Sequence, residues 1–449
     1  MNRTVYTLLL YLLLPFTPLK LLWRGRKQAE YLAHWQERYG FYNQAAQQAI
    51  IWLHCVSVGE TRAAEPLVKA LIAHYPKHQI LLTHTTPTGR ATSQQLFGNS
   101  VQSAYLPYDV PCAVKRFLNH FHPSIGIIME TELWFNLIAA CKQQHIPLLL
   151  VNARLSEKSA LGYAKLGKLA QLGLQQLSAI AAQTEADAQR LRQLGAADVC
   201  IMGNLKFDVA PPDSAATQGA QLRDLLIQPK LVQPKLAQSK LAQSKLAKPR
   251  LAQHRPVFLA ASTRDGEESL ILEAVAKANI PNLLTIIVPR HPQRFDAVAE
   301  LLTKQQLPFV RRSAVLDALS TLGQVDYVLG DSMGEMFTYY ASCDVAFIGG
   351  SLLPLGGQNL IEAFSMGKPV LIGAHTFNFE QITNMAIAAG AALRVNDCNA
   401  LAQQLSTLFA DAEKRQAMAT AARNFSQQNQ GAVQRALALV QQQLTIETA

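Results

Sequence analysis

Short apolar runs recur along the chain from residue 50, and each is followed by a stretch whose apolar residues have helical spacing. The runs are continuous rather than alternating, which is typical of strands buried on both faces of a parallel sheet. This alternation of strand and helix predicts two doubly wound α/β domains that face a cleft. The predicted strands are 50–58, 79–86, 124–129, 146–153, 177–183 and 198–204 in the first half, and 257–262, 283–290, 308–312, 326–331, 344–350 and 369–373 in the second.

The carboxyl ends of these strands are the expected ligand-binding edge of each sheet. Polar residues and glycines gather there, which makes these segments the candidates for a functional site. They are 57–60, 85–90, 130–132, 203–208, 262–264, 290–291 and 349–351.

An apolar N-terminal stretch from Thr4 to Leu19 carries no charge, is interrupted by Pro15 and Pro18, and runs into the basic segment WRGRK (23–27). As a helix it would be roughly 24 Å long, against about 30 Å for the hydrocarbon core of a membrane. The basic flank favours a membrane anchor whose following domain is cytoplasmic. A signal peptide fits less well because no small-residue cleavage site follows, and a buried N-terminal helix is the other alternative.

Composition and charge exclude several classes of protein. Apolar residues make up 49% and charged residues 16% of the chain, which excludes a disordered, collagen-like or polytopic membrane protein. The net charge is +10, but residues 1–40 carry +4 and residues 228–255 carry +7, so the rest of the chain is close to neutral. A neutral body argues against a nucleic-acid-binding core.

A five-residue repeat separates the two halves, with the units QPKLV, QPKLA, QSKLA, QSKLA and KPRLA within 228–255. Its period fits neither a helix nor a strand, and its prolines break helices. We interpret it as an inserted, solvated basic loop, with an auxiliary contact to an anionic membrane as the alternative. The expected segments are an anchor, a first domain, a linker with the repeat, a second domain and a C-terminal helix, at 1–24, 25–212, 213–255, 256–425 and 426–449.

The cysteines and the missing motifs narrow the chemistry. The six cysteines are scattered, without a CxxC pair or a histidine at zinc spacing, which indicates core thiols in a reduced, cytosolic compartment. There is no GxGxxG after a strand and no GxxxxGK[ST], and MGKP (366–369) has proline where a P-loop needs a hydroxyl. NAD-dependent and P-loop functions are therefore disfavoured. We expect neither a metal nor a cofactor.

Carboxylates and a lysine stand at predicted strand ends in the first half. Glu60, in HCVSVGE (54–60), follows the first strand in a turn that opens a helix. There it could take a proton from an incoming hydroxyl, or it could simply be stabilised by the helix dipole. Glu130 and Glu132, in METELW, face the same way if the third strand continues through them. Lys206, in GNLKFD, could offset a developing phosphate charge, although a lone lysine is usually solvated.

Three motifs of the second half form a set, PRH (289–291), DSMGEM (331–336) and GGSLLPLGGQNLIEAFSMGKPV (349–370). GGQN leads into a predicted helix whose free N–H groups suit a phosphate. Glu362, in the first turn of that helix, could accept hydrogen bonds from a ribose. Each motif is weak by itself, since glycines are also ordinary turn residues.

The order of these motifs resembles that of the 3-deoxy-D-manno-octulosonic acid (Kdo) transferases of Gram-negative lipopolysaccharide synthesis. The resemblance covers nearly the whole chain outside the repeat. It implies a GT-B fold of two Rossmann-like domains, and an N-terminal anchor that places the enzyme on the cytoplasmic face of the inner membrane. The matching segments are the anchor with WRGRK and ERYGFY, and then SVGE, METELW, NARLS, GNLKFD, PRH, MGE, GGS and HTFNF.

The resemblance also implies substrates and residue roles. CMP-Kdo would be the donor, bound by the second domain, and a tetraacyl disaccharide 1,4'-bisphosphate precursor of lipid A would be the acceptor, bound on the side of the first. Glu60 would be the proton acceptor, and Glu130 and Lys206 would stabilise the transition state. The residues implied to hold the nucleotide are Arg290, His291, Met333, Gly334, Glu335, Asn359, Leu360, Ile361 and Glu362.

Two motifs depart from the pattern of the family. Gln358 and Leu360, in GGQNLIE (356–362), stand in place of His and Pro, and Phe135 stands in place of Pro after METELW. The changes bear on the contacts of the donor loop. They leave Glu60 and the other implied catalytic residues unchanged.

The expected reaction is attack of a lipid A sugar hydroxyl on the anomeric carbon of Kdo, with loss of CMP, inversion and no metal. The expected partners are CMP-Kdo, the lipid A precursor and an anionic inner-membrane surface, but no nucleic acid. Three alternatives stay open: another GT-B glycosyltransferase, a sugar-nucleotide epimerase of the same architecture, and a membrane-associated binding protein that has lost catalysis.

Overall fold

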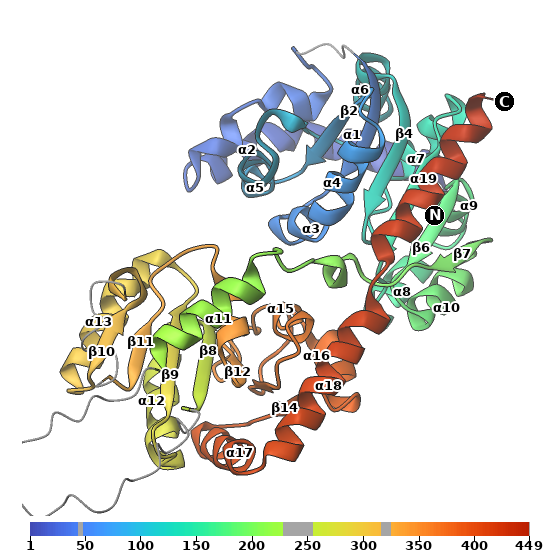
Figure 1. Cartoon of the computed structure of the whole chain (residues 1–449). Helices are drawn as coiled ribbons and strands as arrows, with labels where there is room; N and C mark the ends of the chain where they lie inside the picture. Colours follow the sequence, from blue (N-terminus) through green and yellow to red (C-terminus); the bar gives the residue numbers. More distant parts are fainter. Residues whose placement is uncertain (44–47, 228–254, 316–324, 449) are drawn as a thin grey trace, which may run out of the picture. The chain divides into compact units, whose positions relative to one another are not determined.

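The chain forms two compact units, and the computed structural model describes its residues 1–43, 48–227, 255–315 and 325–448. The first unit is Met1–Asp208 together with Asn429–Ala449, and the second is Val209–Gln428 (Figure 1). The repeat at 228–255 lies outside the described residues except for Arg255, so its interpretation stays a prediction.

The first unit is built on a parallel sheet, in which the described residues form seven strands in the order β3–β2–β1–β4–β5–β6–β7. Successive side chains of a strand point to opposite faces. Ile50 and Trp52 accordingly lie in one buried cluster, and Ile51 and Leu53 lie in another. Both faces of the sheet are therefore buried, as continuous apolar strands predict. The strands are β1 (Ala49–His54), β2 (His78–His84), β3 (Gln102–Tyr105), β4 (Pro123–Met129), β5 (Leu148–Ala153), β6 (Ala179–Ala182) and β7 (Val199–Ile201).

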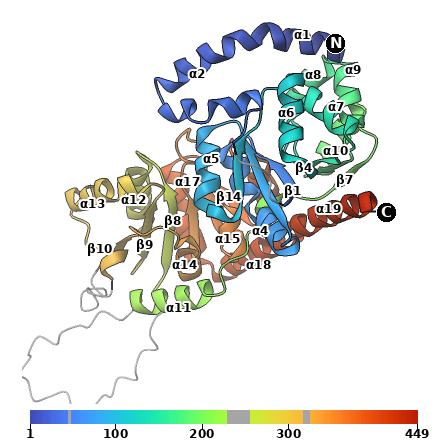
Figure 2. The same cartoon turned by 90° about the horizontal axis from the view of Figure 1, so that it is seen from above.

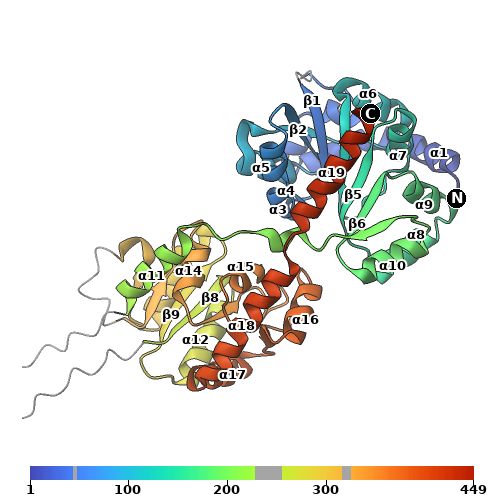
Figure 3. The same cartoon turned by 45° about the vertical axis from the view of Figure 1, so that its right-hand side comes forward.

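Helices cover the two faces of this first sheet. Side chains of α6, α7, α9 and α10 pack in the cluster of Trp52, and side chains of α4 and α19 pack in the cluster of Leu53. The last helix, α19, lies against the first unit (Figure 3), where Asp208 accepts a hydrogen bond from Gly431 N at 2.6 Å. The helices of this unit are α1 (Arg3–Leu13), α2 (Thr17–Gly25), α3 (Val58–Ala63), α4 (Glu65–His74), α5 (Pro87–Phe97), α6 (Pro111–Phe121), α7 (Phe135–Gln143), α8 (Glu157–Ala164), α9 (Lys168–Gln175), α10 (Glu185–Gln193) and α19 (Ala432–Thr448), with 3-10 turns η1 (Leu14–Phe16), η2 (Ala29–Leu32), η3 (Trp35–Tyr39), η4 (Gly98–Ser100) and η5 (Leu205–Asp208).

The second unit repeats the plan, with seven parallel strands among its described residues in the order β10–β11–β9–β8–β12–β13–β14. Its strands are β8 (Val257–Thr263), β9 (Leu284–Pro289), β10 (Phe309–Arg311), β11 (Tyr327–Leu329), β12 (Val345–Ile348), β13 (Val370–Ile372) and β14 (Ala392–Arg394). Its helices are α11 (Ala215–Leu226), α12 (Glu267–Ala278), α13 (Phe295–Lys304), α14 (Met336–Ser342), α15 (Ile361–Ser365), α16 (Glu380–Ala388), α17 (Cys398–Ala410) and α18 (Ala412–Asn429), with 3-10 turns η6 (Pro292–Arg294) and η7 (Arg312–Ala314). Two parallel α/β sheets are thus confirmed.

Every predicted strand has a counterpart, but β3 and β14 are not among the predicted strands, and several predictions run past the observed strand ends, the first of them furthest. Both β3 and β14 lie beside apolar strands at or near a sheet edge, and they are too short to form apolar runs of their own. The strand predicted over 50–58 ends at His54, and Val58 already begins α3. The third strand ends at Met129, so it does not continue through Glu130 and Glu132. The expectation that these two carboxylates share a strand face therefore does not apply.

The N-terminal helices α1 and α2 lie along one side of the first unit with an apolar surface exposed (Figure 2). Among the described residues, Arg3–Gly25 is the candidate span by length and composition, and only 6% of its apolar window is buried. The alternative of a buried N-terminal helix is therefore wrong. On its inner side the hydroxyl of Tyr6 donates to Asp109 at 2.8 Å, and the ring of Tyr6 meets Phe135 edge-on at 5.3 Å. The exposed apolar side chains include Leu8, Leu9, Leu12, Leu13, Phe16, Leu19, Leu22 and Trp23.

Candidate active site

Glu60 lies in the first turn of α3, just after β1, and two hydrogen bonds hold its side chain. Its Oε2 accepts from Val56 N at 2.7 Å, and its Oε1 accepts from Ser57 Oγ at 3.0 Å. Ser57 is the N-cap of α3 and accepts in return from Glu60 N at 3.4 Å. This reciprocal arrangement is close to a capping box, for which Ser-x-x-Glu is the sequence signal. Glu60 is only 9% exposed, so protein groups rather than water molecules hold its carboxylate in position.

The environment of Glu60 raises the pKa of its carboxyl group to about 7. Burial is the main cause, and the charges of Glu130 and Glu132 add to it, against the hydrogen bonds from Val56 and Ser57. A carboxylate with a pKa near neutrality can take a proton and return it at physiological pH. The site thus favours an acid–base role over a purely structural one.

Glu130 follows β4 in a left-handed conformation, with φ of 56°. Its N–H donates to Val151 O at 3.0 Å, which keeps the segment paired to β5. From this position the charge of Glu130 also raises the pKa of Glu132, whose carboxyl group is mainly affected by burial. A non-glycine residue with positive φ costs backbone energy, and such residues are common at functional sites. The strained turn after β4 therefore brings carboxylates toward Glu60.

Lys206 lies in η5, just after β7. The buried side chain of Asn152 accepts from Leu205 N at 3.1 Å, and Asn204 Oδ1 accepts from Lys206 N at 3.0 Å, so the turn is held from β5. Burial is the main cause that lowers the pKa of the Lys206 ammonium; the charges of Glu130 and Glu60 oppose this, while Arg154 adds to it. The three residues implied to be catalytic thus influence one another at the carboxyl edge of the first sheet.

In the second unit, Arg290 is oriented by Gln358, one of the residues that depart from the family pattern. Its backbone N–H donates to Thr263 O at 2.9 Å, and its Nε donates to Gln358 Oε1 at 3.1 Å. His291 is exposed, and its pKa is lowered by partial burial and by the charges of Arg264 and Arg290. Gln358 therefore acts as an acceptor that fixes the guanidinium of Arg290.

The MGE segment (333–335) combines an exposed side chain with a fixed carboxylate. Met333 is 59% exposed, and Gly334 has φ of 81° with open space where a Cβ would stand. Glu335 accepts from Arg312 Nη2 at 2.9 Å and from the hydroxyl of Ser332. The segment can present its backbone and Met333 to a ligand, while Glu335 is already engaged in the protein.

The segment from Asn359 to Glu362 is also held internally. Asn359 Nδ2 donates to Glu362 Oε1 at 3.0 Å, and Asn359 Oδ1 accepts from Ile361 N at 3.1 Å. Leu360 and Ile361 are fully buried and the Ile361 N–H is already donated to Asn359, so neither side chain is available to a nucleotide. The helix that follows, α15, has five residues.

Glu267 is a positioning residue that the motifs did not reveal. Its side chain is fully buried at the start of α12 and accepts from Ser351 N at 2.9 Å and Leu352 N at 3.0 Å, as well as from Gly350 N. It also accepts from Arg264 N at 3.0 Å, which closes the turn after β8. One carboxylate therefore shapes both the GGS loop and the loop of Arg264. The sequence signal was an acidic residue at a helix start just beyond a strand, in TRDGEE.

Comparisons with known proteins agree with this geometry. Residues 33–209 match the family described as 3-deoxy-D-manno-octulosonic-acid transferase (kdotransferase), and residues 269–425 match glycosyl transferases group 1. The 3-deoxy-D-manno-octulosonic acid transferase of Bordetella pertussis is 41% identical over 454 residues, covering 97% of this chain and 98% of the relative. That of Haemophilus influenzae is 37% identical over 447 residues, covering 98% of each. A crystal structure of a glycosyltransferase from Rickettsia africae ESF-5 has a TM-score of 0.53 at 14% identity, covering 89% of this chain and 99% of the other, and supports the fold alone.

The two α/β units and these matches define a glycosyltransferase of the GT-B type. The chain belongs to the family of 3-deoxy-D-manno-octulosonic acid transferases, and it is a Kdo transferase of lipopolysaccharide biosynthesis. The family expected from the motifs is confirmed. The roles of individual residues stay predictions.

Proposed function

We propose that this Kdo transferase moves Kdo from CMP-Kdo to a lipid A precursor, the tetraacyl disaccharide 1,4'-bisphosphate, with inversion and without a metal. The observation that carries the proposal is the Glu60 carboxylate, fixed by Val56 N and Ser57 Oγ and with a pKa of about 7. A base of that strength suits deprotonation of a sugar hydroxyl as the new bond forms.

In the proposed step, the acceptor hydroxyl attacks the anomeric carbon of Kdo while the bond from that carbon to the phosphate oxygen of CMP breaks. Glu60 takes the hydroxyl proton, and CMP leaves with the bonding electron pair. A single displacement of this kind inverts the anomeric carbon. The sugar passes through a state with oxocarbenium character, which a negative environment stabilises.

Glu130 and Lys206, at the edge of the first sheet, would stabilise charges of opposite sign in the transition state. The charge of Glu130 affects both Glu60 and Lys206, so the carboxylate can stabilise positive charge on the sugar while it keeps the pKa of Glu60 high. The half-buried ammonium of Lys206 can stabilise the negative charge of the leaving group. Preorganised charges of this kind supply what a metal ion provides in other transferases.

On the donor side, Arg290 is the cation best placed to meet the phosphate of CMP. Its guanidinium is oriented through Nε by Gln358. The GGS loop is shaped by Glu267, which accepts from Gly350 N and Ser351 N, and Ile361 N donates to Asn359 Oδ1, so these loops frame the donor side with N–H groups that are already bonded within the protein. His291 and Met333 are exposed, and they complete the set of proposed nucleotide contacts.

We further propose that α1 and α2 hold the enzyme on the cytoplasmic face of the inner membrane by lying in its interface. The helices expose leucines along their length, while Tyr6 and Thr7 hydrogen-bond to Asp109 and Asn136 of the first unit. These contacts tie the first two turns of α1 to the domain, which favours a helix that lies on a membrane over one that leaves the domain to cross it.

Replacing Leu9 by Glu on the exposed side of α1 is expected to lower binding of the full-length protein to phosphatidylethanolamine–phosphatidylglycerol vesicles by at least about tenfold, because a carboxylate is costly in the apolar interface. Vesicle flotation measures the effect. Ile201→Glu is the matched control, since Leu9 and Ile201 are each 47% exposed. Equal binding of the two variants would contradict the assignment of α1 to the membrane.

The raised pKa of Glu60 predicts the pH dependence of transfer. Since the base must be ionised, kcat/KM is expected to rise with pH and to reach half of its plateau at about pH 7. Ser57→Ala should move this limb to higher pH, because the hydroxyl of Ser57 lowers the pKa of Glu60. Initial rates between about pH 5 and 9 test this. A limb centred near pH 4.5, or one that does not move in the Ser57 variant, would contradict the role of Glu60.

Donor specificity and metal dependence test the proposed function directly. Purified protein in detergent with the lipid A precursor should release CMP from CMP-Kdo, and excess EDTA should leave the rate unchanged. UDP-N-acetylglucosamine in place of CMP-Kdo should be neither consumed nor epimerised. Consumption of the UDP sugar, or a rate abolished by EDTA and restored by a divalent cation, would favour the alternatives.

A further inference from the structure

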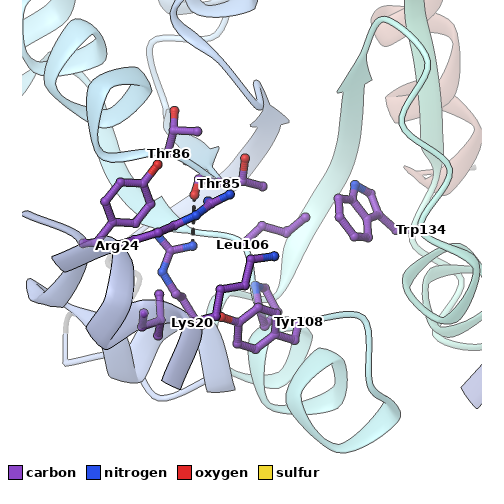
Figure 4. Close-up of a pocket in the computed structure, with 11 residues that line it drawn as sticks. Lys20, Arg24, Thr85, Thr86, Leu106, Tyr108 and Trp134 are labelled. Atoms are coloured by element: carbon purple, nitrogen blue, oxygen red, sulfur yellow. Dashed lines mark hydrogen bonds between the residues drawn. The ribbon is translucent and has the colours of Figure 1, made fainter. Parts of the chain in front are cut away.

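A small cavity in the first unit lies between α2 and the loops that follow β2 and β3. Its volume is about 170 Å³, whereas a water molecule needs about 10–15 Å³ by a comparable measure, so it has room for a polar group of several heavy atoms. Figure 4 shows Lys20 and Arg24 from α2 and Trp134 from the segment before α7 around it. The polar residues that line it include Lys20, Arg24, Arg38, Thr85, Tyr108 and Trp134.

Two side chains that line this cavity, Arg38 and Trp134, have buried donor atoms without partners among the described residues. Arg38 is 6% exposed; its Nη1 donates to Thr85 O at 3.0 Å (dashed in Figure 4), and its guanidinium carbon lies 4.0 Å from the ring centroid of Tyr105. Its Nε and Nη2 are buried and have no hydrogen-bond partner among the described residues, and the same is true of Trp134 Nε1. Leaving a buried donor unpaired is costly, above all on a charged group. These donors therefore favour binding of an acceptor that the described residues do not supply.

The charge of the cavity specifies an anion. Lys20, Arg24 and Arg38 bring three positive charges to its lining, and no carboxylate of the described residues lines it. The nearest acidic residue in sequence, Glu37, is paired with Arg90 at 2.7 Å. Guanidinium and ammonium groups together with an indole N–H are donors only, which matches a phosphate oxygen cluster.

The cavity is connected to the proposed base through a single residue. Thr85 Oγ1 and Thr86 Oγ1 both donate to Val56 O at 3.2 Å, while Val56 N donates to Glu60 at 2.7 Å. On the other side, Lys20 and Arg24 belong to the helix that exposes Leu19, Leu22 and Trp23. An anion held here would thus lie between the apolar surface of α2 and the catalytic carboxylate.

We propose that this cavity binds a phosphate monoester of the glycolipid acceptor and so sets the distance from the membrane surface to the reacting hydroxyl. The proposal rests on the proposed function for the identity of the lipid. The cavity itself requires only a phosphate-bearing lipid. Its cationic donors would strip the phosphate of water and hold it, while the acyl chains stay with the apolar side of α2.

The test compares the bisphosphorylated lipid A precursor with the same lipid after enzymatic removal of its phosphates, using the full-length protein. For the wild type, KM for the intact lipid is expected to be at least about tenfold lower than KM for the dephosphorylated lipid. The dephosphorylated lipid lacks the phosphate that would accept charge-assisted hydrogen bonds from the cavity. The double variant Lys20→Gln with Arg24→Gln, and separately Trp134→Phe, should lose most of this preference. Their kcat and their KM for CMP-Kdo should change less than twofold.

A matched control separates the cavity from general electrostatics. Lys165→Gln with Lys168→Gln removes the same two charges from exposed positions of the first unit that do not line the cavity, and it should keep the preference. A wild type without preference, or a control that loses as much as the cavity variants, would overturn the proposal. Arg38 is left unchanged because its buried contacts make its variants prone to unfold.

Equilibrium binding of the two lipids, measured without CMP-Kdo, separates the proposed phosphate site from the proposed transfer function. Preferential binding of the phosphorylated lipid by a wild type that makes no Kdo product would support the cavity while the proposed function fails. Turnover without any phosphate preference would overturn the cavity and leave the function. Inorganic phosphate that competes at the same concentration as the lipid would assign the site to a free anion and overturn the lipid assignment.

Discussion

Glu60→Gln is expected to lower kcat by about 10³-fold, the range that loss of a general base produces, while binding of both substrates changes little. The amide keeps an oxygen that can accept from Val56 N or Ser57 Oγ, so the turn before α3 should survive. Initial-rate kinetics with both substrates measures the effect. Glu65→Gln, which removes a partly exposed carboxylate paired with Lys69 at the start of α4, is the control and should leave kcat unchanged.

The same substitution has a signature in stability that does not depend on activity. The pKa of Glu60 is about 7 in the folded chain, against 4.5 for an unperturbed glutamate such as that of the unfolded chain. Between pH 4.5 and 7 the folded protein therefore binds the carboxyl proton of Glu60 more tightly than the unfolded chain does. The stabilising contribution of the protonated group is complete below about pH 4.5 and is lost as pH rises through about 7. Glu60→Gln removes that loss, so the variant should gain in melting temperature relative to the wild type as pH rises across this window. A constant difference would contradict the raised pKa.

Glu267→Gln is expected to destabilise the second unit by about 3 kcal/mol and to weaken donor binding, because the amide group cannot accept from all of the backbone N–H groups that now meet the carboxylate. One side-chain oxygen accepts from Ser351 N and Leu352 N, and the other accepts from Gly350 N and Arg264 N. The amide nitrogen would face two of these donors. Thermal unfolding and the KM for CMP-Kdo measure the two effects.

A control for Glu267 lies on the same helix. Glu273 is about half exposed and pairs with Lys277 within α12 at 2.6 Å. Glu273→Gln should leave both the melting temperature and donor KM close to those of the wild type, since exposed ion pairs contribute little. If the two variants behaved alike, the GGS loop would not depend on Glu267.

The parallel sheets could be predicted because burial on both faces leaves a direct trace in the sequence. Strands such as IIWLH and LTIIV are continuous apolar runs, and their ends coincide with polar motifs. The exceptions have the opposite character. Gln102–Tyr105 is an edge strand that mixes polar and aromatic residues, and Ala392–Arg394 is an edge strand of three residues. Edge strands need less apolar surface, so their trace is weak.

The candidate site was predictable where a motif follows a strand, and not where a side chain reaches across the fold. Glu60 lies in the first helical turn after β1 and Lys206 lies in the 3-10 turn after β7, and the structure brings their charges together. By contrast, Glu267 is 83 residues away from the Gly350 N–H that it accepts from, and Arg38 reaches Thr85 over 47 residues. Partners this distant in sequence leave no local pattern, so only the folded chain reveals them.

The most direct test of the central claim is mass spectrometry of the lipid after incubation of the purified full-length protein with CMP-Kdo. The account predicts a lipid A precursor whose mass increases by whole Kdo residues, with CMP as the other product and with little product from Glu60→Gln in the same time. An unchanged lipid with folded wild-type protein, or equal product from the Glu60 variant, would contradict it.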